Sequence, residues 1–200
     1  KNLTDKKKQK IMKKLFLLLT LSLFTLSFVN AQEEKEEEIV YSENIQDTFF
    51  GVKFGASREE VIKAFEKEGL YLDNRISNRD VLLFGRSGGD FLFGGFNWDY
   101  VYCVLSNGKF YDIRFQYTPE YKETALSRFE SVFSALSEKY KMFENQIEDT
   151  NTYKYYLAVS EDDNSVAIKC DKKESNGGEI RYYVVLDYID LTLNKSRDEL

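Results

Sequence analysis

The sequence predicts an α+β fold in which two helices pack on one face of an antiparallel sheet, in the order strand, helix, three strands, helix, three strands. Two segments carry apolar residues at helical spacing behind helix-start signals. Short apolar or alternating segments, joined by turn sequences, occupy the rest of the domain and favour antiparallel pairing. A helix followed by three strands occurs twice, which suggests a tandem duplication, although no repeat of residues accompanies it.

The first half of the domain begins with a short strand over Phe49–Gly55 and a helix over Arg58–Glu68. Ser57 and Glu60 fit a capping box, in which the Ser57 hydroxyl accepts the Glu60 N–H and the Glu60 side chain reaches back. Gly69 is a typical helix stop, because glycine adopts the left-handed conformation without strain.

The strongest turn signal is Asn107-Gly108, which predicts a two-residue hairpin between strands at Asn97–Leu105 and Lys109–Tyr117. Thr118 as N-cap and Pro119 at the first helical position then predict a second helix, ending near Met142. Further predicted strands are the short apolar segments Val81–Phe84 and Phe91–Phe93, before the hairpin, and Tyr153–Val159, Val166–Cys170 and Ile180–Leu191, after the second helix.

The register of the hairpin predicts which side chains are exposed. A two-residue turn places Val104 opposite Tyr111 and Tyr102 opposite Ile113, so these side chains are assigned to the core face. Other apolar side chains then lie on the outer face, where contiguous apolar surface indicates a partner site. The candidate binding residues are Val101, Leu105, Phe110, Tyr156 and Tyr183. The alternative is that they are isolated surface residues, and a register shift of one residue would reverse the faces.

The chain has two cysteines. By the same alternation Cys103 is predicted on the outer face. Pairing of the strands after the second helix places the following residues on the core face: Tyr153, Tyr155, Leu157, Val159, Val166, Ile168 and Cys170. A disulfide between Cys103 and Cys170 is therefore not expected, although an exported chain would permit one.

The N-terminal segment has the anatomy of a signal peptide, with Met12-Lys13-Lys14 followed by an apolar stretch over Leu15–Val29. We expect cleavage after Ala31 and an extracytoplasmic protein, periplasmic or secreted. Gln32 stands where a lipoprotein would carry a cysteine, so no membrane anchor is expected after cleavage. The predicted organisation is an upstream extension and signal peptide at 1–31, an acidic flexible tether at 32–48, one α+β domain at 49–192 and a polar tail at 193–200.

Charge and composition exclude several functions. The chain contains 28 Lys+Arg and 34 Asp+Glu, and removal of residues 1–31 takes away seven Lys and one Asp, leaving 21 against 33. Such an acidic protein lacks the basic footprint that nucleic acids and anionic membranes require. The absence of histidine removes Ser-His and Cys-His nucleophile pairs and the commonest zinc ligand. We predict no catalytic residue, no metal site and no cofactor.

The segment Phe50–Val61, Phe-Gly-Val-Lys-Phe-Gly-Ala-Ser-Arg-Glu-Glu-Val, resembles the first segment of small bacterial envelope proteins. Among these are the small lipoprotein of the outer-membrane barrel-assembly machinery and proteins with the β-lactamase-inhibitor-protein fold. Overall the chain is most similar to uncharacterised secreted Bacteroidetes α+β proteins. The resemblance implies antiparallel strands on which partners are bound, and it carries over no binding residue.

These observations favour an exported, non-catalytic binding protein whose partner is another envelope or extracellular protein. The alternative function is a carboxylate-dependent hydrolase acting on carbohydrate or peptide, because acidic residues are plentiful. Whether the protein is an enzyme is left open at this stage, with the balance toward a non-enzyme.

Overall fold

The computed structural model describes residues 40–145, 151–175 and 177–198. The predicted signal peptide and the first part of the predicted tether, residues 32–39, lie outside this range. Within it, no helix has both the length and the apolar character needed to cross a membrane.

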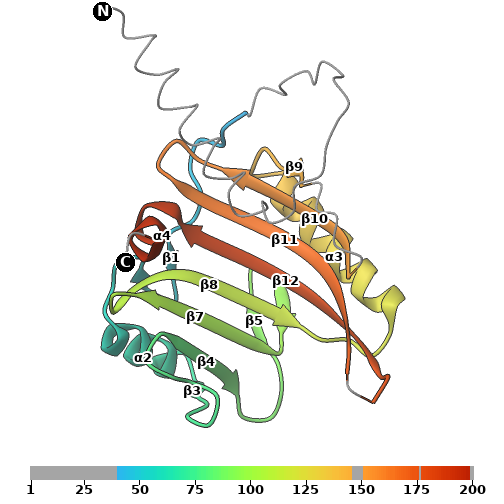
Figure 1. The fold of residues 1–200 in the computed structure, drawn as a ribbon, viewed down its shortest axis with the longest axis horizontal. Coiled ribbons are helices and arrows are strands. Elements are labelled where there is room, and N and C mark those ends of the chain that lie inside the picture. Colours follow the sequence, from blue (N-terminus) through green and yellow to red (C-terminus); the bar gives the residue numbers. More distant parts are fainter. Residues whose placement is uncertain (1–39, 146–150, 176, 199–200) are drawn as a thin grey trace, which may run out of the picture. The chain divides into compact units, whose positions relative to one another are not determined.

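The centre of the fold is an eight-stranded antiparallel sheet (Figure 1). Its strands, in spatial order, are β3 (Leu70–Leu72), β4 (Val81–Arg86), β7 (Tyr100–Ser106), β8 (Lys109–Tyr117), β12 (Ile180–Asp190), β11 (Asn164–Glu174), β10 (Thr152–Val159) and β9 (Phe143–Glu144). Two small hairpins lie outside it, formed by β1 (Thr48–Phe49) with β2 (Val52–Lys53) and β5 (Phe91–Phe93) with β6 (Phe96–Trp98).

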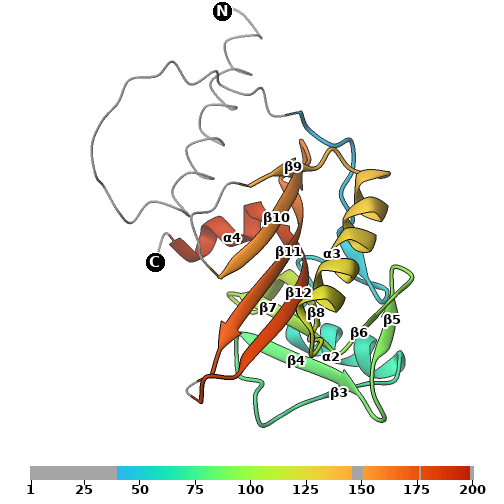
Figure 2. The ribbon, with the colours of Figure 1, turned by 90° about the vertical axis from the view of Figure 1, so that its right-hand side faces the viewer.

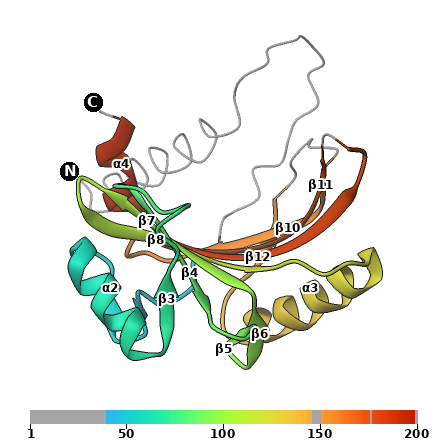
Figure 3. The ribbon, with the colours of Figure 1, turned by 90° about the horizontal axis from the view of Figure 1, so that it is seen from below.

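Two helices, α2 (Arg58–Lys67) and α3 (Lys122–Ser137), lie on one face of the sheet, which we call the helix face (Figures 2 and 3). The predicted fold class is therefore confirmed. A third helix, α4 (Leu191–Asp198), lies on the opposite or outer face. It includes residues 193–198 of the segment predicted as a polar tail at 193–200, and Asp190 caps its start. The Asp190 Oδ1 atom accepts the N–H groups of Thr192 at 2.8 Å and Leu193 at 3.1 Å.

The sheet consists of two halves with the same topology. Helix α2 precedes the strands β3, β4, β7 and β8, and helix α3 precedes β9, β10, β11 and β12. The halves meet where β8 pairs with β12. The predicted repeat thus has four sheet strands in each half rather than three. The additional strands β3 and β9 contain three and two residues, too few for a sequence period to reveal them.

The first helix begins as predicted. The Glu60 N–H donates to Ser57 Oγ at 3.3 Å, and the Ser57 N–H donates to Glu60 Oε2 at 2.8 Å, completing the capping box. The described part of the predicted tether, in contrast, is packed against the domain. Ile45 is buried in the core, and the Ser42 N–H donates to the Val159 carbonyl at 2.9 Å. Residues near the end of the predicted tether therefore pack against the domain, although an acidic run at Glu33–Glu38 precedes them.

The second helix begins three residues later than predicted. Tyr121 is the N-cap of α3 and makes no side-chain capping bond. Thr118 is instead held by the preceding strands, since its N–H donates to Asp99 Oδ2 at 2.7 Å and its hydroxyl accepts from Gln116 Nε2 at 3.2 Å. The predicted end near Met142 was also too late, because α3 ends at Ser137.

Side chains of the helix face form the hydrophobic core, which is rich in aromatic rings. Phe115 lies at its centre, stacked on Phe93 with the ring centroids 3.9 Å apart and tilted toward Trp98 at 5.9 Å. Phe49 adds contacts with both Phe110 and Phe115. The two small hairpins thus carry aromatic side chains that close the core on the helix face.

A β-bulge changes the register predicted for the β7–β8 hairpin. Leu105 pairs with Phe110 as predicted, but Val104 pairs with Asp112, so Tyr111 is an extra residue on β8. Beyond a bulge, the alternation of one strand is shifted by one residue relative to its partner. The set Val101, Cys103, Leu105, Phe110, Ile113 and Phe115 consequently faces the core, while Tyr102 and Val104 face outward.

The register of the β10–β11 hairpin also differs from the prediction by one residue. Tyr156 pairs with Ile168, and Ala158 pairs with Val166. Tyr155, Leu157 and Val159 therefore leave the core face to which they were assigned. The predicted inward placement of Val166, Ile168 and Cys170 is confirmed.

The two cysteines are both buried and unpaired, which confirms that they form no disulfide. The reason given for it was wrong, because Cys103 belongs to the same core cluster as Cys170. The thiols are kept apart by distance along the sheet. Strands β8 and β12 lie between β7 and β11, and three interstrand spacings amount to about 14 Å. A disulfide requires Cα atoms within roughly 7 Å.

Candidate binding groove on the outer face

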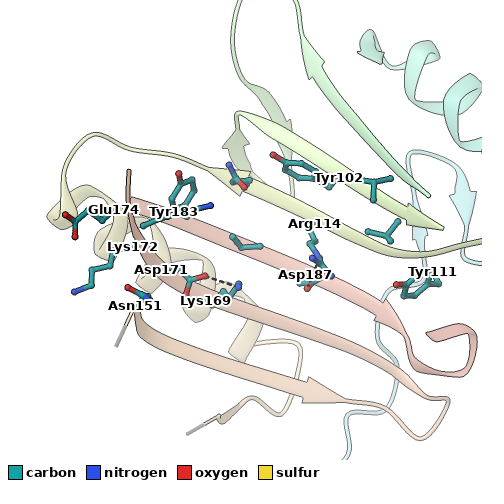
Figure 4. A pocket seen from close by; sticks show the side chains of 15 residues that line it. Tyr102, Tyr111, Arg114, Asn151, Lys169, Asp171, Lys172, Glu174, Tyr183 and Asp187 are labelled. Carbon is teal, nitrogen blue, oxygen red and sulfur yellow. Dashed lines mark ion pairs between the residues drawn. The ribbon is translucent and has the colours of Figure 1, made fainter. Parts of the chain in front are cut away.

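The outer face of the sheet contains a groove with a volume of about 990 Å³ (Figure 4). Its floor is built by alternate residues of five strands, since successive side chains of a strand point to opposite faces. The lining combines aromatic, apolar and charged side chains. They include Tyr102 and Val104 from β7, Arg114 from β8, Lys169 and Asp171 from β11, and Tyr183 and Asp187 from β12.

A second hollow of about 710 Å³ continues the groove toward the other end of the same strands, because Gln116 and Tyr183 line both. Tyrosines gather where the two hollows meet. We call this set the tyrosine surface; its members are Tyr71, Tyr100, Tyr102 and Tyr183. Tyr71 is 49% exposed and Tyr100 is 42% exposed, so their rings are open to a partner. Burial, followed by neighbouring Tyr100 and Tyr183, raises the pKa of Tyr102.

Three charged side chains form a compact cluster on the groove floor, which we call the charge cluster: Asp112, Arg114 and Asp187. Asp187 on β12 lies directly opposite Arg114 on β8, at the seam between the two halves of the sheet. The guanidinium of Arg114 binds Asp112 in a bidentate manner, with Nε donating to Oδ1 at 3.1 Å and Nη2 donating to Oδ2. The Arg114 Nε atom is also 3.3 Å from Asp187 Oδ2.

Exposure differs across the charge cluster. The side chain of Asp112 is 1% exposed, that of Asp187 is 16% exposed and that of Arg114 is 46% exposed. Burial raises the pKa of Asp187 well above its usual value, and the negative charge of Asp112 raises it further. Burial by itself lowers the pKa of Arg114, but the two aspartates outweigh it and raise that pKa overall. The guanidinium therefore stays charged, and Asp187 is the group whose protonation can change.

The end of the groove is formed by a projecting ribbon. The β11–β12 pairing continues to Glu174 and Ile180, whereas β10 stops pairing with β11 at Asp171 and β8 stops pairing with β12 at Val184. The resulting two-stranded extension carries Lys172, Lys173 and Glu174 into the groove wall. At its base, Lys169 Nζ lies 2.9 Å from Asp171 Oδ2.

The candidate residues taken from the sequence do not form one patch. Val101, Leu105 and Phe110 are core residues with exposed fractions of 0%, 4% and 0%, which overturns their assignment to the outer face. Tyr156 lies on the helix face, with its ring 4.4 Å from that of Phe133. Tyr183 alone of the five lines the groove.

Most of the groove was missed because the bulge at Tyr111 carries no sequence signature. The polarity of alternate residues on β7 could nevertheless have revealed the groove. On β7, Val101, Cys103 and Leu105 have no strongly polar group, whereas Tyr100 and Tyr102 alternate with them and carry hydroxyls. Assigning the less polar set to the core would have placed these tyrosines outside.

No grouping of three or more His, Cys, Asp or Glu side chains suited to a metal ion occurs in the part of the chain that the structure describes. The fold and groove together define an α+β protein with a polar, tyrosine-rich hollow on the outer face of its sheet. Comparisons with protein-family models, with curated proteins and with solved structures found no significant match.

Proposed function

We propose that this protein is an exported, non-catalytic binding protein that holds another envelope or extracellular protein on the outer face of its sheet. The tyrosine surface beside the groove carries the proposal. Tyrosine is enriched at protein interfaces, because its rigid ring offers a large contact area and its hydroxyl can hydrogen-bond at the rim. The extracytoplasmic location and cleavage after Ala31 belong to the proposal and rest on the N-terminal sequence.

The contrast between the two faces supports this assignment. The helix face is occupied by α2, α3 and the aromatic core, so its apolar side chains have an internal role. Tyr71 and Tyr100, in contrast, expose nearly half of their surface beside a hollow large enough for side chains of another protein. Charged groups of both signs surround the tyrosines, as is typical of a non-obligate interface.

Affinity capture with the tagged chain, from an envelope and secreted extract of its source, tests the proposal. We expect the double variant Tyr102→Ala/Tyr183→Ala to weaken capture of a stoichiometric partner about hundredfold or more, because two central tyrosines are removed. The control is Tyr121→Ala, which deletes a ring that is 61% exposed at the start of α3. Equal capture by wild type and both variants would contradict the proposal.

A carboxylate-dependent hydrolase is the second candidate, favoured by the proximity of Asp112 and Asp187 and by the raised pKa of Asp187. A carboxyl group that stays protonated can act as a general acid. In this case Asp187→Asn abolishes hydrolysis in a panel of glycans and peptides, with Asp171→Asn as the control. The bidentate bonds from Arg114 occupy Asp112, which leaves it poorly placed to activate water.

A further inference from the structure

The charge cluster is not balanced. Two carboxylates, Asp112 and Asp187, share a single guanidinium, that of Arg114. Asp112 receives both of the strong Arg114 hydrogen bonds, while Asp187 receives one longer contact. The nearest lysine on β11, Lys169, is engaged with Asp171 at 2.9 Å. When both aspartates are ionised, Arg114 therefore faces two negative charges on the groove floor.

The Oδ1 atom of Asp187 shows this charge imbalance directly. Among the described residues, no hydrogen-bond donor reaches Asp187 Oδ1, although that atom is buried. Leaving a buried carboxylate oxygen without a donor is costly. Burial and the charge of Asp112 raise the pKa of Asp187 and so favour its protonated form, in which Asp187 can hydrogen-bond to Asp112. A bound group with an N–H donor and a positive charge could take over from this proton.

We propose that Asp187 is the polar anchor of the groove and that its carboxylate, whose side chain is 16% exposed, pairs with an arginine or lysine side chain of the bound protein. The inference rests on the proposed function and adds the chemistry that the partner presents. When the cation binds, the Asp187 proton leaves to solvent and the new ion pair replaces the hydrogen bond to Asp112.

The surroundings of Asp187 fit this chemistry. The groups that face it are Asp112 and Arg114 from β8, Lys169 from β11 and Tyr155 from β10. Arg114 and Lys169 are each paired with an aspartate, so their positive charges repel an incoming cation only in part. The adjoining Tyr102 and Tyr183 can contact the aliphatic stem or the charged head of such a side chain.

The first test uses the unmodified protein and a small probe. N-acetyl-arginine amide is titrated against the chain while the carboxyl carbon of Asp187 is followed by NMR across a pH series. We expect the probe to lower the apparent pKa of Asp187 and to release a proton on binding. The uncharged citrulline analogue, which has nearly the same shape, should do neither. Equal effects of the two probes, or none from either, would overturn the inference.

The second test uses matched variants. We expect Asp187→Asn to weaken binding of the arginine probe about tenfold or more, as for a lost charge-assisted hydrogen bond. Glu59→Gln removes a negative charge from an exposed position of α2, outside the groove, and should change the affinity about twofold at most. Similar losses in both variants would indicate a general effect of charge and overturn the anchor role.

The captured partner separates this inference from the proposed function. If Tyr102→Ala/Tyr183→Ala abolishes capture and Asp187→Asn does not, the anchor role is wrong and the binding function stands. If Asp187→Asn and the tyrosine variants all abolish capture, both stand. If the arginine probe binds at Asp187 but no protein is captured, the anchor chemistry is supported and the proposed protein partner fails.

Discussion

Replacement of Phe110 by alanine is expected to destabilise the protein by about 3–5 kcal/mol, because it removes a fully buried ring. The Phe110 ring packs 5.0 Å from that of Phe54 and 6.4 Å from that of Phe49, measured between centroids. A cavity at this position cannot collapse easily, since its walls are other aromatic rings. Thermal unfolding followed by circular dichroism should show a fall in Tm of about 10 °C.

Tyr100→Ala is the matched control, because Tyr100 is an outer-face residue of β7 and is 42% exposed. It should change the free energy of unfolding by about 0.5 kcal/mol or less. The regular hairpin register, without a bulge, predicts the reverse order, with Tyr100 in the core and Phe110 outside. A Tyr100→Ala variant less stable than Phe110→Ala would therefore overturn the bulge at Tyr111.

Local signals in the sequence predicted local structure well. The Ser57/Glu60 capping box is present, and β8 spans the predicted residues Lys109–Tyr117. Asn107 and Gly108 have φ angles of 51° and 74°, as the predicted two-residue hairpin requires. Each of these features depends on a few neighbouring residues. The fold class followed, because it needs only the type and order of the elements.

Features that depend on distant contacts were not predictable in this way. Thr118 looks like a helix cap, but Asp99, nineteen residues earlier, binds its N–H instead. Ser42 and Ile45 follow a charge run, yet they pack because β10 and the core are present to receive them. Strand β9 exists only as a pairing partner of β10. In each case tertiary contacts override a local preference.

The prediction of the candidate site residues failed for a single geometric reason. A face assignment by alternation is correct only until the first bulge. The extra residue at Tyr111 exchanges the side chains of β7 that face the core with those that face outward. The side chains of Asp112 and Arg114 face outward because both residues lie beyond the bulge on the strand that contains it. Their meeting with Asp187 required the β8–β12 pairing, which joins residues more than seventy positions apart.

Removal of the Arg114 charge is the second large effect that we expect. Arg114→Met keeps most of the aliphatic stem but leaves the carboxylates of Asp112 and Asp187 without their shared counter-ion. Breaking a fully buried pair costs about 3–5 kcal/mol, and partial exposure of Arg114 reduces this to about 2 kcal/mol near neutral pH. Urea unfolding of the variant and the wild type at matched pH measures the difference in free energy of unfolding.

The pH dependence identifies the cause of this loss. The pKa of Asp187 is raised in the folded state, so over the window between its unfolded value, near 3.8, and its folded value the native protein binds more protons than the unfolded chain. Stability contributed by this group is therefore present in acid and declines as the pH rises through the window. Arg114 lowers the pKa of Asp187, so its removal widens the window and deepens the decline.

The deficit of Arg114→Met should accordingly be largest at neutral pH and shrink toward pH 4. Asp187→Asn in the same background should restore part of the stability, because it removes one of the two repelling charges. A double-mutant cycle over Arg114 and Asp187 then gives a coupling energy that follows the pH. If the deficit is the same at every pH and Asp187→Asn does not relieve it, Arg114 stabilises the fold through packing of its stem. In that case the charge cluster contributes no electrostatic balance to the groove floor.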